Sequence, residues 1–182
     1  PCRALRAALM GLHVLQPEAQ QDGLLGPLPD LPFAVFHAFG NADANDLVDA
    51  IAKAAGKGDA FKHAFKSFLN QNGVPMLATK LDCDPKTGAA LDLTQSRYLP
   101  LGSNGDPNGL WGIPVCVRFP GGVQCQMLSG KQATMKVEGG QCPAWYMPNA
   151  DGVGYYRYEM AKADRAALDK VIAQRNDGEQ LA

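Results

Sequence analysis

The spacing of apolar positions along the chain separates three zones. Residues 1–72 and 161–182 place apolar side chains at helical intervals, whereas residues 73–160 consist of short alternating or β-branched runs divided by turn-forming clusters. This pattern predicts a mainly β member of the α+β class: an antiparallel β-sandwich of about seven short strands, with helices at its N- and C-terminal ends. Because no helical crossover separates the predicted strands, parallel pairing is not expected.

Seven segments of the middle zone are predicted strands. They cover residues 74–83, 89–96, 113–119, 123–128, 134–137, 144–147 and 154–159. The breaks between them are rich in Gly, Pro, Asn and Asp, the residues that turn a chain. The shortest break predicts a hairpin with a tight turn centred on Pro120 and Gly121.

Amphipathic helices are predicted on both sides of these strands. Apolar stripes are formed by Leu5, Leu9 and Leu12, by Phe61, Phe65, Phe68 and Leu69, and by Ala161, Leu168, Val171 and Ile172. A further helical pattern at residues 47–55 has Asn45 as its expected N-cap and Gly56 as its expected end. Residues 176–182 are polar and are expected to fray. One small sandwich cannot cover all these stripes, so we expect exposed apolar patches.

Composition and charge exclude several classes of partner. With 46% apolar and 19% charged residues, the chain has the composition of a folded globular protein. A formal net charge of -1 leaves no positive excess for the phosphates of nucleic acid or for an anionic membrane surface. No apolar run approaches the ~20 residues that cross a bilayer. We therefore expect neither a nucleic acid partner nor a membrane span.

The five cysteines, at positions 2, 83, 116, 125 and 142, suggest a disulfide rather than a metal site. None belongs to a Cys-x-x-Cys pair and no His lies close to another, so a structural zinc site is not supported. The predicted hairpin turn sets Cys116 opposite Cys125, with β-carbons about 4.5 to 5.5 Å apart. A disulfide between them would indicate a periplasmic or secreted protein. Two free, buried cysteines are the alternative.

Three stretches of the chain together resemble part of a known peptidase family. They are Phe68-Leu-Asn-Gln-Asn-Gly-Val-Pro75, then Leu91-Asp-Leu-Thr-Gln-Ser-Arg-Tyr98 with Trp111-Gly-Ile-Pro-Val115, and Pro148-Asn-Ala-Asp-Gly-Val-Gly-Tyr-Tyr-Arg157. In this order they are similar to the region after the catalytic core of the zinc aminopeptidases of the alanyl/leucyl aminopeptidase (gluzincin) family. The resemblance covers residues 37–175, and the shared order of these short motifs carries it.

The resemblance implies three domain segments. Residues 1–72 would be the end of a thermolysin-like catalytic domain, residues 73–160 a β-sandwich, and residues 161–182 the start of a C-terminal helical domain. The first residue is Pro rather than Met, which suggests either a piece excised from a longer parent protein or an incomplete reading frame. For that parent the resemblance implies zinc-dependent removal of N-terminal residues from peptides.

The family's zinc motif, H-E-x-x-H followed by a further Glu, occurs nowhere in this sequence. Its histidines stand at positions 13, 37 and 63, too far apart for an i, i+4 ligand pair. No catalytic, cofactor-binding or metal residue is therefore carried over, and zinc is expected only in the parent. The expected partners are the catalytic and C-terminal helical domains of that parent, which this chain would hold at a fixed angle. Peptide substrate would be bound only by the parent.

A different class of function stays open: a free-standing β-sandwich module that binds carbohydrate or a protein partner. Trp111, Trp145, Tyr155 and Tyr156 could form a platform for stacking sugars. Aromatic residues in strands more often pack within a sheet, which is the simpler interpretation.

Two further chemical interpretations are weaker. Asn149, Asp151 and Gly152 could suggest a cation-binding loop, but the alternating carboxylates and terminal Glu of an EF-hand are missing, and a turn explains them better. Cys142 and His63 could be drawn as the nucleophile pair of a cysteine hydrolase. A core or bridged cysteine explains Cys142 better.

Overall fold

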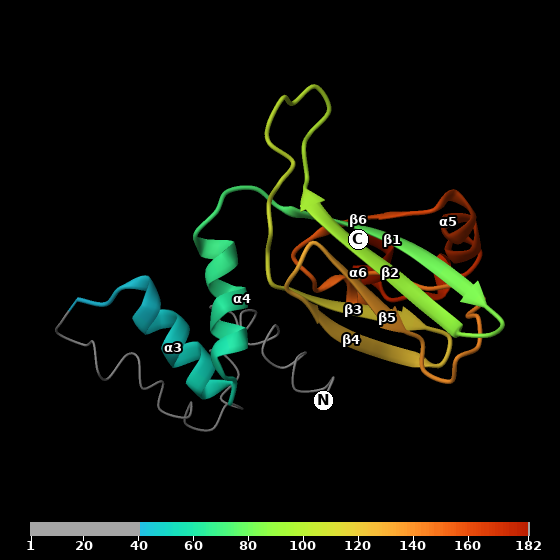
Figure 1. Ribbon diagram of the computed structural model, residues 1–182, viewed down its shortest axis with the longest axis horizontal. Coiled ribbons are helices and arrows are strands. Elements are labelled where there is room, and N and C mark those ends of the chain that lie inside the picture. Colours follow the sequence, from blue (N-terminus) through green and yellow to red (C-terminus); the bar gives the residue numbers. More distant parts are fainter. Residues whose placement is uncertain (1–40, 182) are drawn as a thin grey trace.

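The computed structural model describes residues 41–181 (Figure 1). The stripe predicted at Leu5, Leu9 and Leu12 lies outside the described residues. Within these residues the chain forms six strands in two sheets, with helices before and after them. The fold is therefore a β-rich member of the α+β class, and the predicted class is confirmed.

The larger sheet has four strands in the order β5-β2-β1-β6. β1 (Pro75–Asp84) pairs antiparallel with β2 (Gly88–Arg97), and β2 pairs antiparallel with β5 (Gln132–Lys136). β6 (Arg157–Met160) instead lies parallel to β1. The expectation of antiparallel pairing throughout is wrong here. The chain between β1 and β6 includes four other strands and serves as the long crossover that parallel pairing requires.

The smaller sheet is the hairpin of β3 (Ile113–Phe119) and β4 (Gly122–Leu128). Pairing continues to the last residue of β3 and the first of β4, so Pro120 and Gly121 alone form the turn, as predicted. Gly122 has a φ of 145°, a conformation that glycine adopts without a steric penalty.

Both sheets contribute to one hydrophobic core. It includes Leu77, Leu91 and Leu93 from the larger sheet and Ile113, Val115 and Val117 from the hairpin, all fully buried. On β1 and β2 the buried residues alternate with exposed or half-buried ones such as Lys80 and Asp92. This alternation is typical of a sheet with one face on the core and one face in water.

The predicted strand at residues 144–147 does not form. Met147 makes a single antiparallel bridge with Arg118, through backbone hydrogen bonds of 2.8 and 2.9 Å. Pro143 and Pro148 flank this segment and lack the N–H group that a longer ladder needs.

α3 (Ala44–Ala54) begins at a different cap from the predicted Asn45. The N-cap is Asp43, whose carboxylate accepts the backbone N–H groups of Asn45 and Asp46 at 2.7 and 3.0 Å. The bond from the Asp46 N–H is the largest cause of a lowered pKa for Asp43, because it favours the ionised carboxylate. Gly56 has a φ of 60° and follows the helix, as predicted for its end.

α4 (Asp59–Leu69) follows and contacts α3. The Lys62 ammonium lies 2.9 Å from the Asp49 carboxylate of α3. This pair is half-exposed and contributes little to stability.

The C-terminal part contains α5 (Lys162–Asp169), a 3-10 turn (Ile172–Gln174) and α6 (Asp177–Leu181). The prediction that this end frays is wrong for α6, because its Glu179 is only 2% exposed. The polar residues that suggested fraying bond instead to Arg118 of β3 and to the loop that precedes β6.

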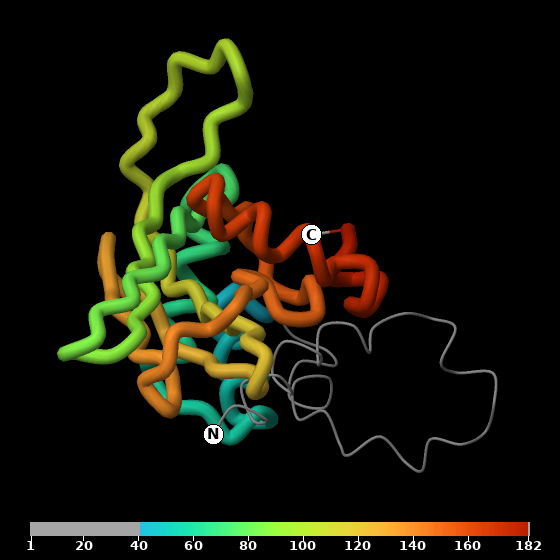
Figure 2. The backbone as a smooth tube through the Cα atoms, turned by 90° about the vertical axis from the view of Figure 1, so that its right-hand side faces the viewer, coloured from blue at the N-terminus to red at the C-terminus, as the bar shows by residue number. Residues whose placement is uncertain are grey.

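The connection between β2 and β3, residues 98–112, projects from the body in both views (Figures 1 and 2). The buried side chain of Gln95 holds its base. The Gln95 amide nitrogen donates to the carbonyls of Trp111 and Gly130, and its oxygen accepts the Trp111 N–H at 2.9 Å. Leu101 in the projecting part is fully exposed.

Candidate docking groove

Two small residues let α4 approach the start of β3. A β-carbon added to Gly112 would lie 2.6 Å from the α- and β-carbons of Ala64, a separation that real β-carbons do not adopt. The Ser67 hydroxyl accepts the Gly112 N–H at 2.9 Å and donates to the Ala64 carbonyl at 2.6 Å. The Gln71 amide donates to the Leu110 carbonyl at 2.6 Å. These contacts set the position of α4 relative to the hairpin.

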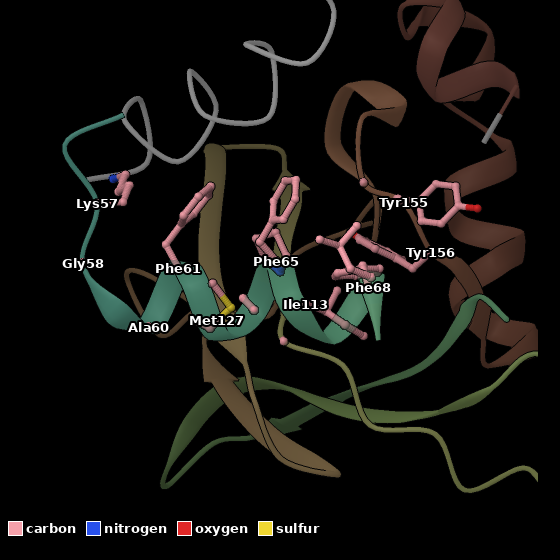
Figure 3. A pocket seen from close by; sticks show the side chains of 15 residues that line it. Lys57, Gly58, Ala60, Phe61, Phe65, Phe68, Ile113, Met127, Tyr155 and Tyr156 are labelled. Atoms are coloured by element: carbon pink, nitrogen blue, oxygen red, sulfur yellow. The ribbon is translucent and has the colours of Figure 1, made fainter. Parts of the chain in front are cut away.

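An apolar groove of about 480 Å³ runs beside α4 (Figure 3). Its walls include Phe61, Phe65 and Phe68 of α4, Met127 of β4 and Tyr155. In Figure 3 the rings of Phe61 and Phe65 stand on the same side of α4, with Lys57 near one end of the groove and Tyr155 near the other. Nearly all exposed atoms of the lining are carbon. A groove of this size and composition suits apolar side chains and offers no set of catalytic groups.

Large apolar side chains remain exposed in this groove and at its edge. Leu69 is 49% exposed and Tyr155 is 67% exposed, while Phe61 and Phe65 are half-buried. The exposed apolar patch expected from the helical stripes is therefore present along α4. Contiguous patches of this kind mark interaction sites.

The loop at residues 148–156 places Tyr155 at the end of the groove. Within it the Asn149 side chain forms two hydrogen bonds with Gly154, at 3.0 and 2.8 Å, so the loop is closed on itself. The Tyr155 ring then lies edge-on to the Phe68 ring, with centroids 6.2 Å apart. The motif read from sequence as Pro148–Arg157 is thus a structural turn that carries a groove residue.

The same loop supplies a buried ionic cluster on its other side. The Arg118 guanidinium of β3 contacts the carboxylates of Asp151 and Glu179, at 2.5 Å each. The Asp151 N–H donates to the Glu179 carboxylate at 2.9 Å, and Asn176 donates to the Asp151 carboxylate at 2.8 Å. Arg118 and Asp151 are about one-fifth exposed, and the Glu179 side chain is 1% exposed. The cluster therefore joins β3, the loop and α6.

Close backbone packing reinforces this joint. A β-carbon on Gly152 would lie 2.2 Å from the Gly178 carbonyl oxygen, and one on Gly178 would lie 2.4 Å from the Asp151 carbonyl oxygen. Asp151 itself has a φ of 62°, a left-handed conformation that is uncommon outside glycine. Here the contacts with Arg118 and α6 hold it.

Two buried tyrosines connect the same region to the core. The Tyr146 hydroxyl lies 3.0 Å from the Thr79 hydroxyl and donates to the Asp164 carboxylate of α5 at 3.1 Å. The Tyr156 hydroxyl donates to the Pro148 carbonyl at 2.8 Å. Burial raises the pKa of both tyrosines well above the ordinary value, because it disfavours the tyrosinate.

The structure contains two disulfides within the described residues. Cys116 and Cys125 face each other across the hairpin, with α-carbons 4.1 Å apart. Cys83 at the end of β1 is bonded to Cys142, with α-carbons 5.4 Å apart. Sequence reasoning did not pair these last two, because 59 residues separate them and only the fold brings them together. Two cysteine pairs of this kind indicate an extracellular or otherwise oxidising location.

The aromatic residues considered as a sugar platform do not share a surface. Trp111 and Tyr156 are 1% and 7% exposed and belong to the core. Trp145 is half-buried, and the Arg175 guanidinium lies over its ring, 4.8 Å from the ring centroid. Tyr155 is the one member of the four that is classed as exposed.

The other candidate groups are likewise engaged in the fold. Cys142 is in a disulfide, so it offers no thiol to His63. The Asp151 carboxylate bonds to Arg118, which agrees with the turn interpretation of its loop. Residues 41–181 bring together no group of three His, Cys, Asp or Glu side chains that could hold a metal ion.

In the part of the chain that the structure describes, no helix has the length and apolar character needed to span a membrane.

Comparison with known proteins finds a likeness over part of the chain. No protein-family model matches the chain. The chain is 28% identical over 121 residues to Tricorn protease-interacting factor F2 of Thermoplasma acidophilum. The matched part is 66% of this chain but only 13% of that relative, so the chain spans a small share of the relative's length. The likeness gives limited support to the peptidase family that the sequence motifs resemble, and it indicates a peptidase-related protein.

Proposed function

We propose that this chain is a non-catalytic interdomain region of a zinc-dependent aminopeptidase that removes N-terminal residues from peptides. In this proposal residues 1–72 end the catalytic domain, residues 73–160 are the β-sandwich, and residues 161–182 begin the C-terminal helical domain. The chain would hold the two large domains at a fixed angle.

One observation carries the proposal: a single loop contacts helices that precede and follow the strands in the sequence. Through Tyr155, the loop at residues 148–156 touches Phe68 of α4, which belongs to the first segment. Through Asp151 it bonds to Arg118 and to α6, which belongs to the last segment. A spacer that sets an angle needs such rigid joints at both ends, because free rotation at either one would lose the angle.

The exposed groove beside α4 supports the same proposal. A free-standing domain gains nothing from leaving phenylalanines half in water, at a cost of ~25 cal/mol for each Å² of exposed apolar surface. A neighbouring domain would cover them. The similarity to a relative of which the chain matches only 13% is consistent with further domains in the parent.

The zinc of the parent would be held by other parts of the polypeptide. Residues 41–181 contain no suitable cluster of donors, so we assign no step of the reaction to them. The two disulfides favour a parent that is periplasmic or secreted.

The alternative function, a carbohydrate-binding module, gains less from the structure. A partly polar hollow of about 530 Å³ lies on the sheet surface formed by β1, β2 and β5, where Thr134 donates to Asp92 beside Lys80. Its lining has no aromatic side chain on which a sugar ring could stack. Within this alternative, a module that binds a protein partner is favoured over one that binds carbohydrate.

The proposal is tested on the gene and on the chain. We expect the reading frame upstream of the Pro1 codon to encode H-E-x-x-H followed by a Glu, and the intact parent to hydrolyse aminoacyl amides. The isolated chain should contain no stoichiometric zinc and should show no turnover. Zinc or turnover in the isolated chain, or a parent frame without the motif, would overturn the proposal.

A further inference from the structure

We infer that Asn104 is a site of spontaneous covalent modification, at which the side-chain amide is converted to a carboxylate through a succinimide. Asn104 and Gly105 lie in the connection between β2 and β3 that projects from the body in Figures 1 and 2. The co-reactant is water, and the product is aspartate or isoaspartate. This inference goes beyond the proposed function and does not depend on it.

The reaction uses two groups that are neighbours in the chain. The Gly105 backbone nitrogen loses its proton to solvent and attacks the side-chain carbonyl carbon of Asn104. A cyclic imide closes as the Cγ–Nδ2 bond breaks, and the amino group takes up a proton and leaves as ammonia. Water then opens the ring at either carbonyl and restores the Gly105 N–H. In sum, water is consumed and ammonia released without oxidation or reduction. Glycine favours ring closure because it has no β-carbon beside the attacking nitrogen.

The structure distinguishes this Asn-Gly pair from two others. The three pairs in the chain are Asn72-Gly73, Asn104-Gly105 and Asn108-Gly109. The second lies in the stretch 101–108, in which every residue is exposed. The Gly105 N–H donates to the Ser103 hydroxyl at 3.3 Å, a long bond within the same loop. In the described part of the chain, only Leu99 and Ser103 have atoms within 4 Å of a β-carbon position on Gly105. Nothing outside the loop therefore holds this peptide.

Asn108-Gly109 is held at the base of the same connection. The Gly109 N–H donates to the Pro107 carbonyl at 3.0 Å, and Gly109 is buried. The Pro107 carbonyl also accepts the Arg97 N–H at 2.8 Å. A β-carbon on Gly109 would lie 2.3 Å from the Trp111 ring, so this peptide packs against the core. Ring closure at Asn108 would have to break these contacts first.

Asn72-Gly73 is exposed but anchored on both sides. The preceding residue, Gln71, donates to a carbonyl of the projecting connection at 2.6 Å, and the following residue, Val74, accepts the Tyr98 N–H at 2.8 Å. These bonds restrict the rotation that would bring the Gly73 nitrogen onto the Asn72 side chain. We therefore expect Asn104 to react first.

The modification would change the charge of the connection while leaving the folded body intact. Asp106 is the one charged residue in the sequence from 98 to 112, so a carboxylate at position 104 doubles the negative charge there. Isoaspartate also routes the backbone through the former side chain, which lengthens the loop. The buried Gln95 side chain holds the base of the connection at Trp111 and Gly130, away from Asn104.

The test compares the folded chain with the same chain unfolded in urea. Each is incubated at mildly alkaline pH in water enriched in heavy oxygen, digested under mildly acidic conditions and analysed by mass spectrometry. A product formed during the incubation carries heavy oxygen, which separates it from earlier modification. In the folded chain Asn104 should react at least about tenfold faster than Asn108, the factor expected for one hydrogen bond that must break first. In urea the three pairs should react at rates within about threefold of one another, because no structure distinguishes them.

Variants test the roles of the glycine and of the position. Gly105→Ala should slow the reaction at Asn104 about tenfold in both states, because a β-carbon hinders the attacking nitrogen. The fold tolerates this change, since the φ of Gly105 is not positive and the nearest atom is the end of the Leu99 side chain at 3.0 Å, which can move. Asn104→Gln should abolish the product. The matched control Asn108→Gln should leave the rate at Asn104 unchanged.

Three results would overturn the inference. The first is a folded chain in which Asn72 or Asn108 reacts as fast as Asn104. The second is a folded chain whose Asn104 stays unmodified while the chain in urea reacts. The third is a Gly105→Ala chain that reacts at the rate of the unchanged chain, which would mean that no succinimide forms.

Discussion

Removing the cation of the buried ionic cluster should destabilise the whole protein. In Arg118→Met, the apolar side chain has a similar length, but the Glu179 carboxylate loses its cation. That carboxylate is 1% exposed and keeps only the Asp151 N–H among the bonds shown. Without the guanidinium, a buried carboxylate has no charged partner, which is costly.

The size of the effect follows from burial. Breaking a buried ion pair by removing one partner costs about 3–5 kcal/mol. Arg118 and Asp151 are 22% and 20% exposed, so the lower end applies, and we expect a loss of about 3 kcal/mol. For a chain of this length, 1 kcal/mol corresponds to about 2–4 °C, so the midpoint of thermal unfolding should fall by about 6–12 °C.

Calorimetry of the wild type and two variants provides the assay. The matched control is Arg165→Met, which removes the same side chain from an exposed i, i+4 pair with Asp169 that is 60% and 63% exposed. This control should change stability by less than about 0.5 kcal/mol. Amide hydrogen exchange should also show that α6 loses protection in Arg118→Met.

Two results would refute this reasoning. The first is an Arg118→Met midpoint no lower than that of Arg165→Met, which would mean that the cluster contributes nothing. The second concerns the double variant Arg118→Met/Glu179→Met. It should recover part of the loss because it also removes the unpaired carboxylate. If the two losses simply add, the desolvation argument is wrong.

Three further predictions concern packing, covalent links and pH. Gly112→Ala should cost about 1–3 kcal/mol in urea unfolding because its methyl group collides with Ala64; an unchanged midpoint would contradict the close approach of α4. Replacing Cys83 and Cys142 with Ser should lower the free energy of unfolding by about 4 kcal/mol, whereas the same change at the hairpin disulfide should lower it by about 2.5 kcal/mol. The difference follows from the sequence separations of 59 and 9, because a longer closed loop restricts the unfolded chain more. Equal losses would show that loop length does not set the effect. Because burial raises the pKa of Tyr156, we expect the free energy of unfolding to be unaffected below pH ~10 and to fall as the pH rises above it. The absorbance of the Tyr156 tyrosinate should appear only as the chain unfolds. Ionisation of every tyrosine in a chain that is still folded would contradict the burial of Tyr156.

Local features could be read from the chain because neighbouring residues produce them. The turn at Pro120 and Gly121 sets the register of the hairpin, and that register places Cys116 opposite Cys125. The helical repeat of phenylalanines gives α4 and its apolar face. The N-cap of α3 was missed by two residues, because Asn45 and Asp43 are equally suitable by type and only the backbone geometry chooses between them.

Tertiary structure decided everything that depends on distant segments. The parallel position of β6, the Cys83–Cys142 disulfide and the burial of Glu179 against Arg118 each join residues that no local pattern relates. The sequence by itself determined which faces are apolar and where the chain turns, since side-chain periodicity and turn chemistry act over a few residues. Which apolar face stays uncovered depends on how the elements pack, and packing left the groove beside α4 open.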